Sequence, residues 1–221
     1  NSNAESLKAL PAHGLSDAEP LMAGLALDEK RIKQCQIFEQ RRAREGKWPT
    51  VIVPEQPIKL RAKPRNARPV ELEAAIMKYN FNLGDNRRNG CFINAFQPNS
   101  DGTVTDYTTR LMWKSKASAD VSRSDADRYV STLNTKKYAG YSDWRLPTTE
   151  EMASLIDWHR YGATSYLDHN IFQMRSVKYM TADTYEYEGF KRVWTVNSSF
   201  RLIEITSSTD EPAHVQAVRS L

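Results

Sequence analysis

The chain has 221 residues, a net charge of +4, 40% hydrophobic residues and a mean hydropathy of −0.64. It is long enough to bury a core, and no apolar run approaches the roughly 18 residues of a membrane-spanning helix, so the composition is that of a globular protein and excludes a membrane-spanning one. Residues 1–70 carry 13 Lys and Arg against 8 Asp and Glu, whereas residues 71–221 carry 18 against 19. The positive charge therefore belongs to the N-terminal part, and we expect no nucleic-acid partner.

Residues 5–46 predict a helical segment. Residues 1–4 are typical of an expression-vector remnant, and the sequence after them lacks the basic and apolar regions of a signal peptide. Ser16 begins a capping box with Glu19, and apolar residues then recur at helical spacing. One face of this helix is apolar, so residues 16–45 could dock on the body, on an upstream domain or on a second copy, which would give self-association.

Residues 47–75 are expected to form a proline-rich, basic connector, which ends in a short helix that begins at Glu71 and runs to Tyr79. Five prolines interrupt the segment before this helix. Its second half holds five basic residues with no acid among them: Lys59, Arg61, Lys63, Arg65 and Arg68. Either these residues bind phosphate or sulfate groups, or they are the solvated charges of a linker, which is the more common use of such a run.

Residues 76–221 predict one module of short strands and tight turns around two helices. The expected strands are 92–96, 103–105, 111–113, 178–181, 193–196, 201–205 and 215–218. The two expected helices begin at Ser124 and at the capping box Thr148–Glu151. This pattern indicates an α+β fold with a twisted antiparallel sheet and two main helices, preceded by the N-terminal helix.

Three motifs in the module are the most distinctive. Residues 101–106 are Asp-Gly-Thr-Val-Thr-Asp, residues 111–113 are Leu-Met-Trp, and residues 138–148 are Tyr-Ala-Gly-Tyr-Ser-Asp-Trp-Arg-Leu-Pro-Thr. In the last motif, alternation places tryptophan and leucine on one strand face and arginine on the other, proline ends the strand, and threonine caps the next helix. The residues expected to have structural roles are Trp113, Trp144, Arg145, Leu146, Pro147 and Thr148.

Together, in this order, the motifs resemble the Lcl C-terminal domain family, a bacterial module. Val215–Ser220 and Lys78–Phe81 add to the resemblance, which covers residues 76–221. It implies a C-type-lectin-like fold, related to that of the formylglycine-generating enzyme, in which the terminal strand 215–218 pairs with a strand near the start of the module. It also implies a recognition module for a protein or a polysaccharide, with an envelope or secreted location.

Two positions depart from the family pattern. Arg110 replaces a glycine, so a positive φ at this position would be strained in this chain. Met180 stands where a tryptophan is common. The stretch 157–200 is the least family-like, and since lectin-like folds hold their ligands in late loops, the family's binding specificity does not carry over to this chain.

Several residues could in principle carry chemistry. Gln97-Pro98-Asn99 is similar to a calcium-binding tripeptide but precedes the core helices, so we interpret it as a turn. Cys35 and Cys91 form no CxxC pair, and we interpret them as reduced thiols. A loop cluster with poor spacing for a metal ion consists of Asp157, His159, Asp168 and His169. Glu150 and Glu151 could be paired catalytic carboxylates, but helix capping accounts for them. We therefore expect no cofactor, no metal and no enzyme activity.

Ligand contact is expected in the late aromatic residues. The stretch 185–191 predicts an exposed hairpin tip. The candidate ligand-binding residues are Tyr185, Tyr187, Phe190, Trp158 and Tyr161. A recognition module that uses these residues is the favoured hypothesis. The alternatives are an enzyme with a shallow polar site on the same scaffold, and a structural or oligomerising domain that uses the N-terminal helix.

Overall fold

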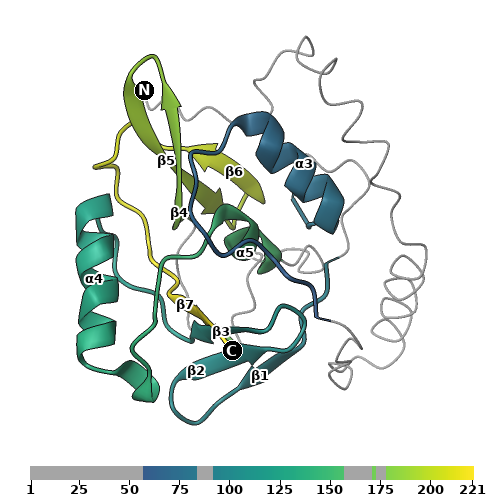
Figure 1. Ribbon diagram of the computed structural model, residues 1–221, viewed down its shortest axis with the longest axis vertical. Helices are drawn as coiled ribbons and strands as arrows, with labels where there is room; N and C mark the ends of the chain where they lie inside the picture. Colours follow the sequence, from purple (N-terminus) through teal and green to yellow (C-terminus); the bar gives the residue numbers. More distant parts are fainter. Residues whose placement is uncertain (1–56, 84–91, 157–170, 173–177) are drawn as a thin grey trace.

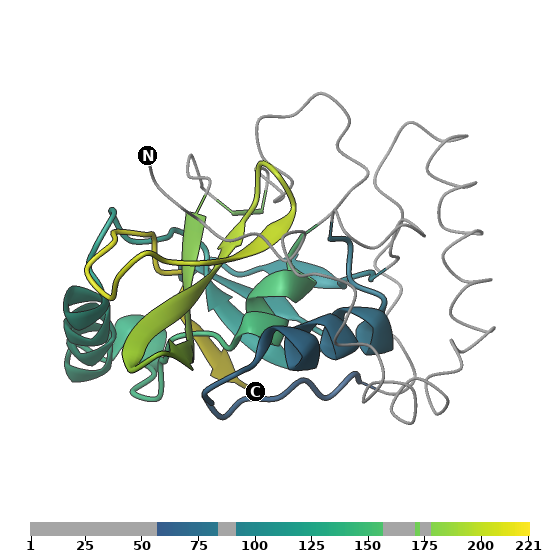
Figure 2. The same cartoon turned by 90° about the horizontal axis from the view of Figure 1, so that it is seen from above.

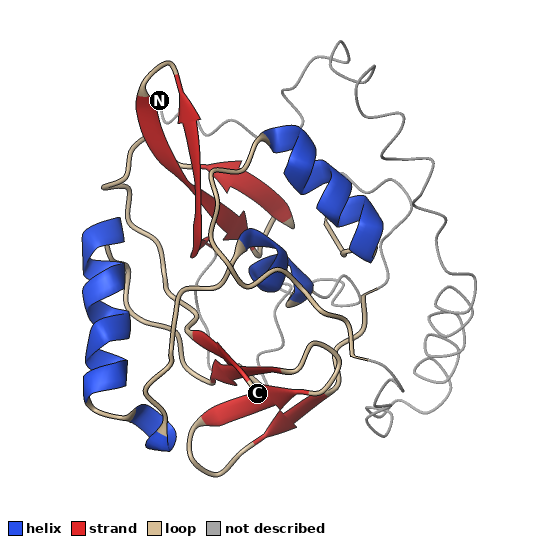
Figure 3. Cartoon of the chain, viewed as in Figure 1, coloured by secondary structure: helices blue, strands red, loops and turns tan. Residues whose placement is uncertain are grey.

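The computed structural model describes residues 57–83, 92–156, 171–172 and 178–221 (Figure 1). Their strands form two antiparallel sheets, and Figure 3 shows the two groups of strands with a short helix, α5, between them. The α+β class is therefore confirmed, but the strands divide into two sheets where one was expected. The predicted N-terminal helix, both cysteines, Trp158 and Tyr161 lie outside the described residues.

The first sheet has the strand order β1-β2-β3-β7. Its strands are β1 (Phe96–Pro98), β2 (Thr103–Asp106), β3 (Leu111–Lys114) and β7 (Val218–Ser220). β7 pairs antiparallel with β3, with Val218 opposite Trp113, so the expected pairing of the terminal strand near the start of the module is confirmed. The position of the strand expected at 215–218 is wrong, because the paired residues are Val218–Ser220. The strand expected at 92–96 is wrong in position, because pairing with β2 begins only at Phe96 and continues into Pro98.

The second sheet has the strand order β4-β5-β6 and contains the long hairpin of the molecule. Its strands are β4 (Lys178–Tyr187), β5 (Phe190–Asn197) and β6 (Leu202–Ile205). The register of β4 and β5 shifts between Met180 and Thr184, which marks a bulge. The hairpin turn is Glu188-Gly189, and both residues have positive φ, as a tight two-residue turn requires.

Three α-helices and a 3-10 turn complete the described fold: α3 (Pro69–Tyr79), α4 (Arg123–Thr135), η3 (Tyr138–Gly140) and α5 (Thr149–Ser154). α5 begins with the predicted capping box, in which Thr148 and Glu151 bond to each other's backbone amides. α4 is capped by Ser122, two residues before the expected Ser124, because the Ser122 hydroxyl accepts from the Asp125 amide. α4 and α3 lie on opposite sides of the body (Figures 1 and 2). No helix among the described residues is long and apolar enough to cross a bilayer.

Two hydrophobic clusters form the core, and each is built around large aromatic side chains. Trp113 and Trp194 lie in one cluster and Trp144 in the other, and none is more than 2% exposed. Met180, at the position where the family favours tryptophan, is fully buried in the second cluster. These side chains exclude water from the space between the sheets and fix the strands that position the polar residues described below.

The distinctive motifs contact one another through the turn before β2. Gly102 has φ +82°, and a Cβ there would meet the Tyr138 hydroxyl at 2.5 Å, so the position requires glycine. The Tyr138 hydroxyl donates to the Gly102 carbonyl at 3.1 Å. Arg110 has φ +56°, so the family's glycine is replaced at a position that does need the left-handed region.

The buried side chain of Asp106 stabilises the turn between β2 and β3 through hydrogen bonds. It is fully buried and accepts from the amides of Ala95 and Thr108 and from the Thr109 hydroxyl. Burial raises its pKa to about 6, against an ordinary value of 3.8, although these donors act in the opposite direction.

The raised pKa predicts a stability that depends on pH. The folded carboxyl binds its proton more tightly than the unfolded one, so its contribution is fully present below about pH 4 and is lost as the pH rises through about 6. The parent should lose about 1–3 kcal/mol of unfolding free energy between pH 4.5 and 7.5 from this group. Asp106→Asn keeps one acceptor oxygen and cannot ionise, so urea unfolding at the two pH values should show a flatter profile. Parallel profiles for parent and variant would show that Asp106 does not titrate in this range.

Candidate functional site

Residues 57–68, here called the strap, pack against the module instead of forming a solvated connector. Leu60 and Ala67 are buried in the first core cluster. The Ile58 amide donates to the Thr108 carbonyl at 2.7 Å, and the Thr148 hydroxyl donates to the Arg61 carbonyl at 2.7 Å. The strap thus contacts both the turn of the first sheet and the start of α5.

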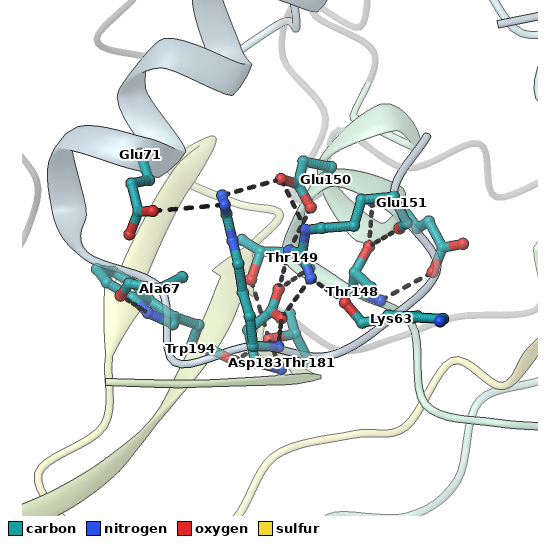
Figure 4. Close-up of polar contacts among 12 residues, drawn as sticks. Lys63, Ala67, Glu71, Thr148, Thr149, Glu150, Glu151, Thr181, Asp183 and Trp194 are labelled. Atoms are coloured by element: carbon teal, nitrogen blue, oxygen red, sulfur yellow. Dashed lines mark hydrogen bonds and ion pairs between the residues drawn. The ribbon is translucent and has the colours of Figure 1, made fainter. Parts of the chain in front are cut away.

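Arg61 pairs with two buried carboxylates, Glu150 at the start of α5 and Asp183 in β4. Figure 4 shows both acids among the polar contacts of this region. Its Nη1 and Nη2 atoms donate to the two oxygens of Asp183 at 2.9 and 2.7 Å. Its Nε donates to Glu150 at 3.2 Å, and Nη2 also pairs with Glu150. The side chain of Asp183 is 0% exposed and that of Glu150 only 6% exposed, so both acids need a countercharge, and Arg61 provides it to both.

Asp183 is the most fully bonded carboxylate of this group. Besides Arg61, it accepts from the amides of Thr149 at 2.7 Å and Arg65 at 2.9 Å. Burial alone would raise its pKa, but the Arg61 guanidinium and the Thr149 amide hold the pKa below its ordinary value. Asp183 is therefore ionised at neutral pH, and it ties together β4, the strap and the first turn of α5.

The arginines that follow in the strap are also paired. Arg65 contacts Glu150 at 3.4 Å and Glu71 of α3 at 3.5 Å, and the Arg68 amide donates to Glu71 at 2.7 Å. Burial opposes ionisation of Glu71, but the Arg68 amide and the charge of Arg65 lower its pKa. The anion-binding site considered from the sequence would thus require Arg61 and Arg65 to leave carboxylates that they already neutralise.

Lys59 and Lys63 differ from the strap arginines. Both side chains are exposed, and neither forms an ion pair with another described residue. They are the two members of the basic run whose charges point toward solvent without a nearby acid. Any binding of phosphate or sulfate groups by the strap would have to rest on these two lysines and on Arg68, which is 72% exposed but pairs with Glu71.

The adjacent acids Glu150 and Glu151 pair with different arginines, Glu150 with Arg61 and Arg65 of the strap and Glu151 with Arg145. Glu151, with a side chain only 1% exposed, forms a two-pronged ion pair with Arg145, in which both N–O distances are 2.7 Å. It also accepts from the Thr148 amide at 2.8 Å as part of the helix cap. Each carboxylate is thus held by arginine, and proton transfer to or from a substrate would first require an ion pair to open.

The predicted structural residues of the third motif lie in or beside the core. Trp144 and Leu146 are buried in the second cluster, and Arg145 reaches the other way, toward Glu151. The Pro147 carbonyl accepts from the Ala182 amide of β4 at 2.7 Å, and Thr148 caps α5. The motif therefore connects β4 to the start of α5.

The predicted hairpin tip is exposed and aromatic. Tyr187 of β4 lies opposite Phe190 of β5, and their exposed fractions are 52% and 68%. Tyr185, two residues before Tyr187, is half-buried and packs on Trp194 with ring centroids 5.8 Å apart. The Tyr185 and Tyr187 rings are nearly parallel, with centroids 6.1 Å apart and 15° between the planes. We call Tyr185, Tyr187 and Phe190 the aromatic face.

The other residues considered for chemistry have structural roles or are not described. Asn99 of the Gln97-Pro98-Asn99 stretch donates to the hydroxyls of Thr103 and Thr105 across the turn into β2. In the part of the chain that the structure describes, no group of His, Cys, Asp and Glu side chains could hold a metal ion. The loop cluster of residues 157, 159, 168 and 169 lies outside the described residues, as do Trp158 and Tyr161.

These features define an α+β module of two antiparallel sheets in which two buried acids, Glu150 and Asp183, are neutralised by arginines from a strap. The model of the Lcl C-terminal domain family matches residues 102–219, more than half of the chain, and the chain therefore belongs to this family. No curated protein and no solved structure gives a significant match. The family match begins at the turn before β2 and runs into β7, so the strap and α3 precede it.

Proposed function

We propose that this chain is a non-catalytic recognition module with a C-type-lectin-like fold, and that it binds a protein partner through the aromatic face. The observation that carries the proposal is the pair Tyr187 and Phe190, two exposed rings opposite each other at the end of a hairpin whose base is locked in the core. Large exposed rings are costly in water and are the side chains that contribute most at protein interfaces.

The hairpin that carries the aromatic face is anchored to the core and to the strap. Trp194, the ring on which Tyr185 packs, donates from its Nε1 to the Ala67 carbonyl at 2.9 Å. The Glu186 amide donates to the Asn66 side chain at 3.0 Å, which ties the outer part of β4 to the strap. A partner that contacts the face would therefore order few side chains on binding, and this lowers the entropic cost of the complex.

The composition of the face favours a protein over a sulfated glycan. Glu186 and Glu188 lie beside Tyr187, and Glu186 is opposite Lys191 across the hairpin. Arg192 lies opposite Tyr185, so acids and bases balance at this end of the hairpin and no basic patch gathers there for sulfate groups. Phe190 offers no hydroxyl to a sugar. A neutral polysaccharide is the second candidate, because the nearly parallel rings of Tyr185 and Tyr187 form a surface on which sugar rings can stack.

The double variant Tyr187→Ala/Phe190→Ala should test the proposal. It removes only exposed side chains, so the unfolding midpoint should stay near that of the parent, while affinity for the partner falls at least about tenfold. Binding would be measured by a concentration series against an array of neutral and sulfated polysaccharides and against proteins of a bacterial envelope extract, at low and high salt. Binding through rings should change little with salt.

Phe200→Ala is the matched control, because Phe200 lies in the turn before β6 and is 68% exposed, the same fraction as Phe190. It should bind as the parent does. Saturable binding of the parent that the tip variant retains would contradict the proposal. If the parent binds a neutral polysaccharide and no protein, and the tip variant loses that binding, the partner of the aromatic face is a glycan and not a protein.

A further inference from the structure

The strap extends the second sheet at its outer edge. β4 is the edge strand, and the strap forms a parallel bridge to it at Asn66 and Thr184. The Ala67 amide donates to the Thr184 carbonyl at 2.8 Å, and the Thr184 amide donates to the Arg65 carbonyl at 3.0 Å. This is the geometry by which proteins bind extended peptides, where the main chain gives affinity and side chains give specificity.

The side-chain part of this arrangement selects a guanidinium group. The Nε of Arg61 donates to Glu150, its Nη1 donates to Asp183 and to the Lys63 carbonyl, and its Nη2 donates to both acids. Every nitrogen of the planar group is therefore used. A lysine ammonium has one nitrogen and could not satisfy two converging carboxylates in this way.

The arginine and the two acids that bind it come from different parts of the chain. Glu150 and Asp183 lie within residues 102–219, which match the family, whereas the strap precedes them. Arg61 and Asp183 are 122 positions apart in the sequence. Without the strap, the module would hold two like charges that converge on the same nitrogen position with no cation between them, an arrangement that favours binding of a cation.

We infer that Glu150, Asp183 and the adjoining edge of β4 form a recognition site for an arginine on an extended chain, and that the strap is its resident occupant. Pro57 and Pro64 restrict the strap to extended conformations before it binds, which reduces the entropy lost in the site. This site is separate from the aromatic face and takes a different ligand class, a guanidinium group carried by a peptide strand.

The variant Arg61→Ala in the full chain empties the guanidinium position and allows it to be probed with methylguanidine. The melting temperature of the variant should lie below that of the parent and should rise saturably as methylguanidine is added. Methylammonium should give no such rise, because it lacks the planar set of donors. The parent, whose site is filled by Arg61, should not respond to either compound.

Arg123→Ala is the matched control. The side chain of Arg123 is 25% exposed, close to the 22% of Arg61, but it donates to the carbonyls of Thr181 and Ala182 and pairs with the exposed Asp127. Loss of this arginine leaves no pair of converging buried acids, so methylguanidine should not stabilise the variant. If Arg61→Ala is only partly folded, its folded fraction by circular dichroism replaces the melting temperature as the readout.

A synthetic peptide of residues 57–68 tests the extended-chain part of the inference. It should bind the Arg61→Ala variant, and a peptide with alanine in place of its own Arg61 should bind at least about tenfold more weakly. No gain in melting temperature or folded fraction with methylguanidine, or an equal gain in Arg123→Ala, would overturn the inference. Neither assay uses Tyr187 or Phe190, so failure here leaves the proposed function standing.

Discussion

Replacement of Asp183 by alanine should lower the free energy of unfolding by about 3–5 kcal/mol, because it breaks a buried ion pair and leaves donors without an acceptor. Arg61 would keep Glu150, but the amides of Thr149 and Arg65 would each lose a bond to Asp183. In a domain of this size the melting temperature should fall by roughly 10 °C or more, which calorimetry or urea unfolding would measure.

Two further variants isolate the cause of this loss. Asp183→Asn keeps one acceptor oxygen without the charge, so it should lose less than the alanine variant. Asp127→Ala removes an acid whose side chain is 62% exposed and which pairs with Arg123, and it should cost no more than about 1 kcal/mol. A loss for Asp183→Ala as small as that for Asp127→Ala would show that the buried pair does not hold the strap in place.

Alanine at Trp113 or Trp144 should cost about 3–5 kcal/mol, since each side chain is buried and its removal leaves a cavity. Trp113 packs in the first core cluster opposite Val218, and Trp144 packs in the second between Tyr138 and Tyr141. Urea unfolding of each single variant would give the two losses. A variant that kept the stability of the parent would place its tryptophan outside the core.

Phenylalanine at the same positions should separate the two tryptophans. The Trp144 Nε1 donates to the Tyr138 carbonyl at 3.0 Å, whereas the Trp113 Nε1 is buried and has no hydrogen-bond partner among the described residues. Trp144→Phe loses side-chain volume and a hydrogen bond. Trp113→Phe loses the same volume, but it also removes a buried donor that has no acceptor, and this offsets part of the loss in stability. Trp113→Phe should therefore be the more stable of the two, and the reverse order would contradict this account.

Local patterns in the sequence predicted the elements that local physics determines. The capping box at Thr148 begins α5, and the strands expected at 103–105 and 111–113 are β2 and β3. The short helix before the module is α3. Turn chemistry, capping and alternation act over a few residues, so they can be recognised without knowing the fold.

The strap and its partners could not be predicted in the same way. Its arginines have no acid nearby in the sequence, which is typical of a solvated linker, whereas their acids are Glu150 and Asp183, far along the chain. Glu150 had another local explanation, since a first-turn glutamate suits a helix start, and the residues next to Asp183 give no sign of a cationic partner. Only tertiary contacts reveal that these charges neutralise each other.

The hairpin tip could be predicted only in part from the sequence. The run from Tyr185 to Phe190 predicted an exposed aromatic turn, and two of its three candidate residues are indeed more than half exposed. Alternation alone could not show that Tyr185 would lean onto Trp194, because the position of Trp194 depends on the register of the hairpin. The division of the strands into two sheets likewise depends on long-range pairing.

The pairing of β7 with β3 has a consequence for how the chain acquires its structure. Met112 and Arg219, which face each other in this pair, are 107 positions apart, and the strap must find β4 over a similar span. Both closures join segments that leave the ribosome at widely different times, so neither can form early in synthesis. Contacts of such high sequence separation slow the search for the native state, and we expect refolding to take milliseconds to seconds or longer. During that interval the buried acids would be exposed to water, and their charge would help to keep the unfinished chain from aggregating.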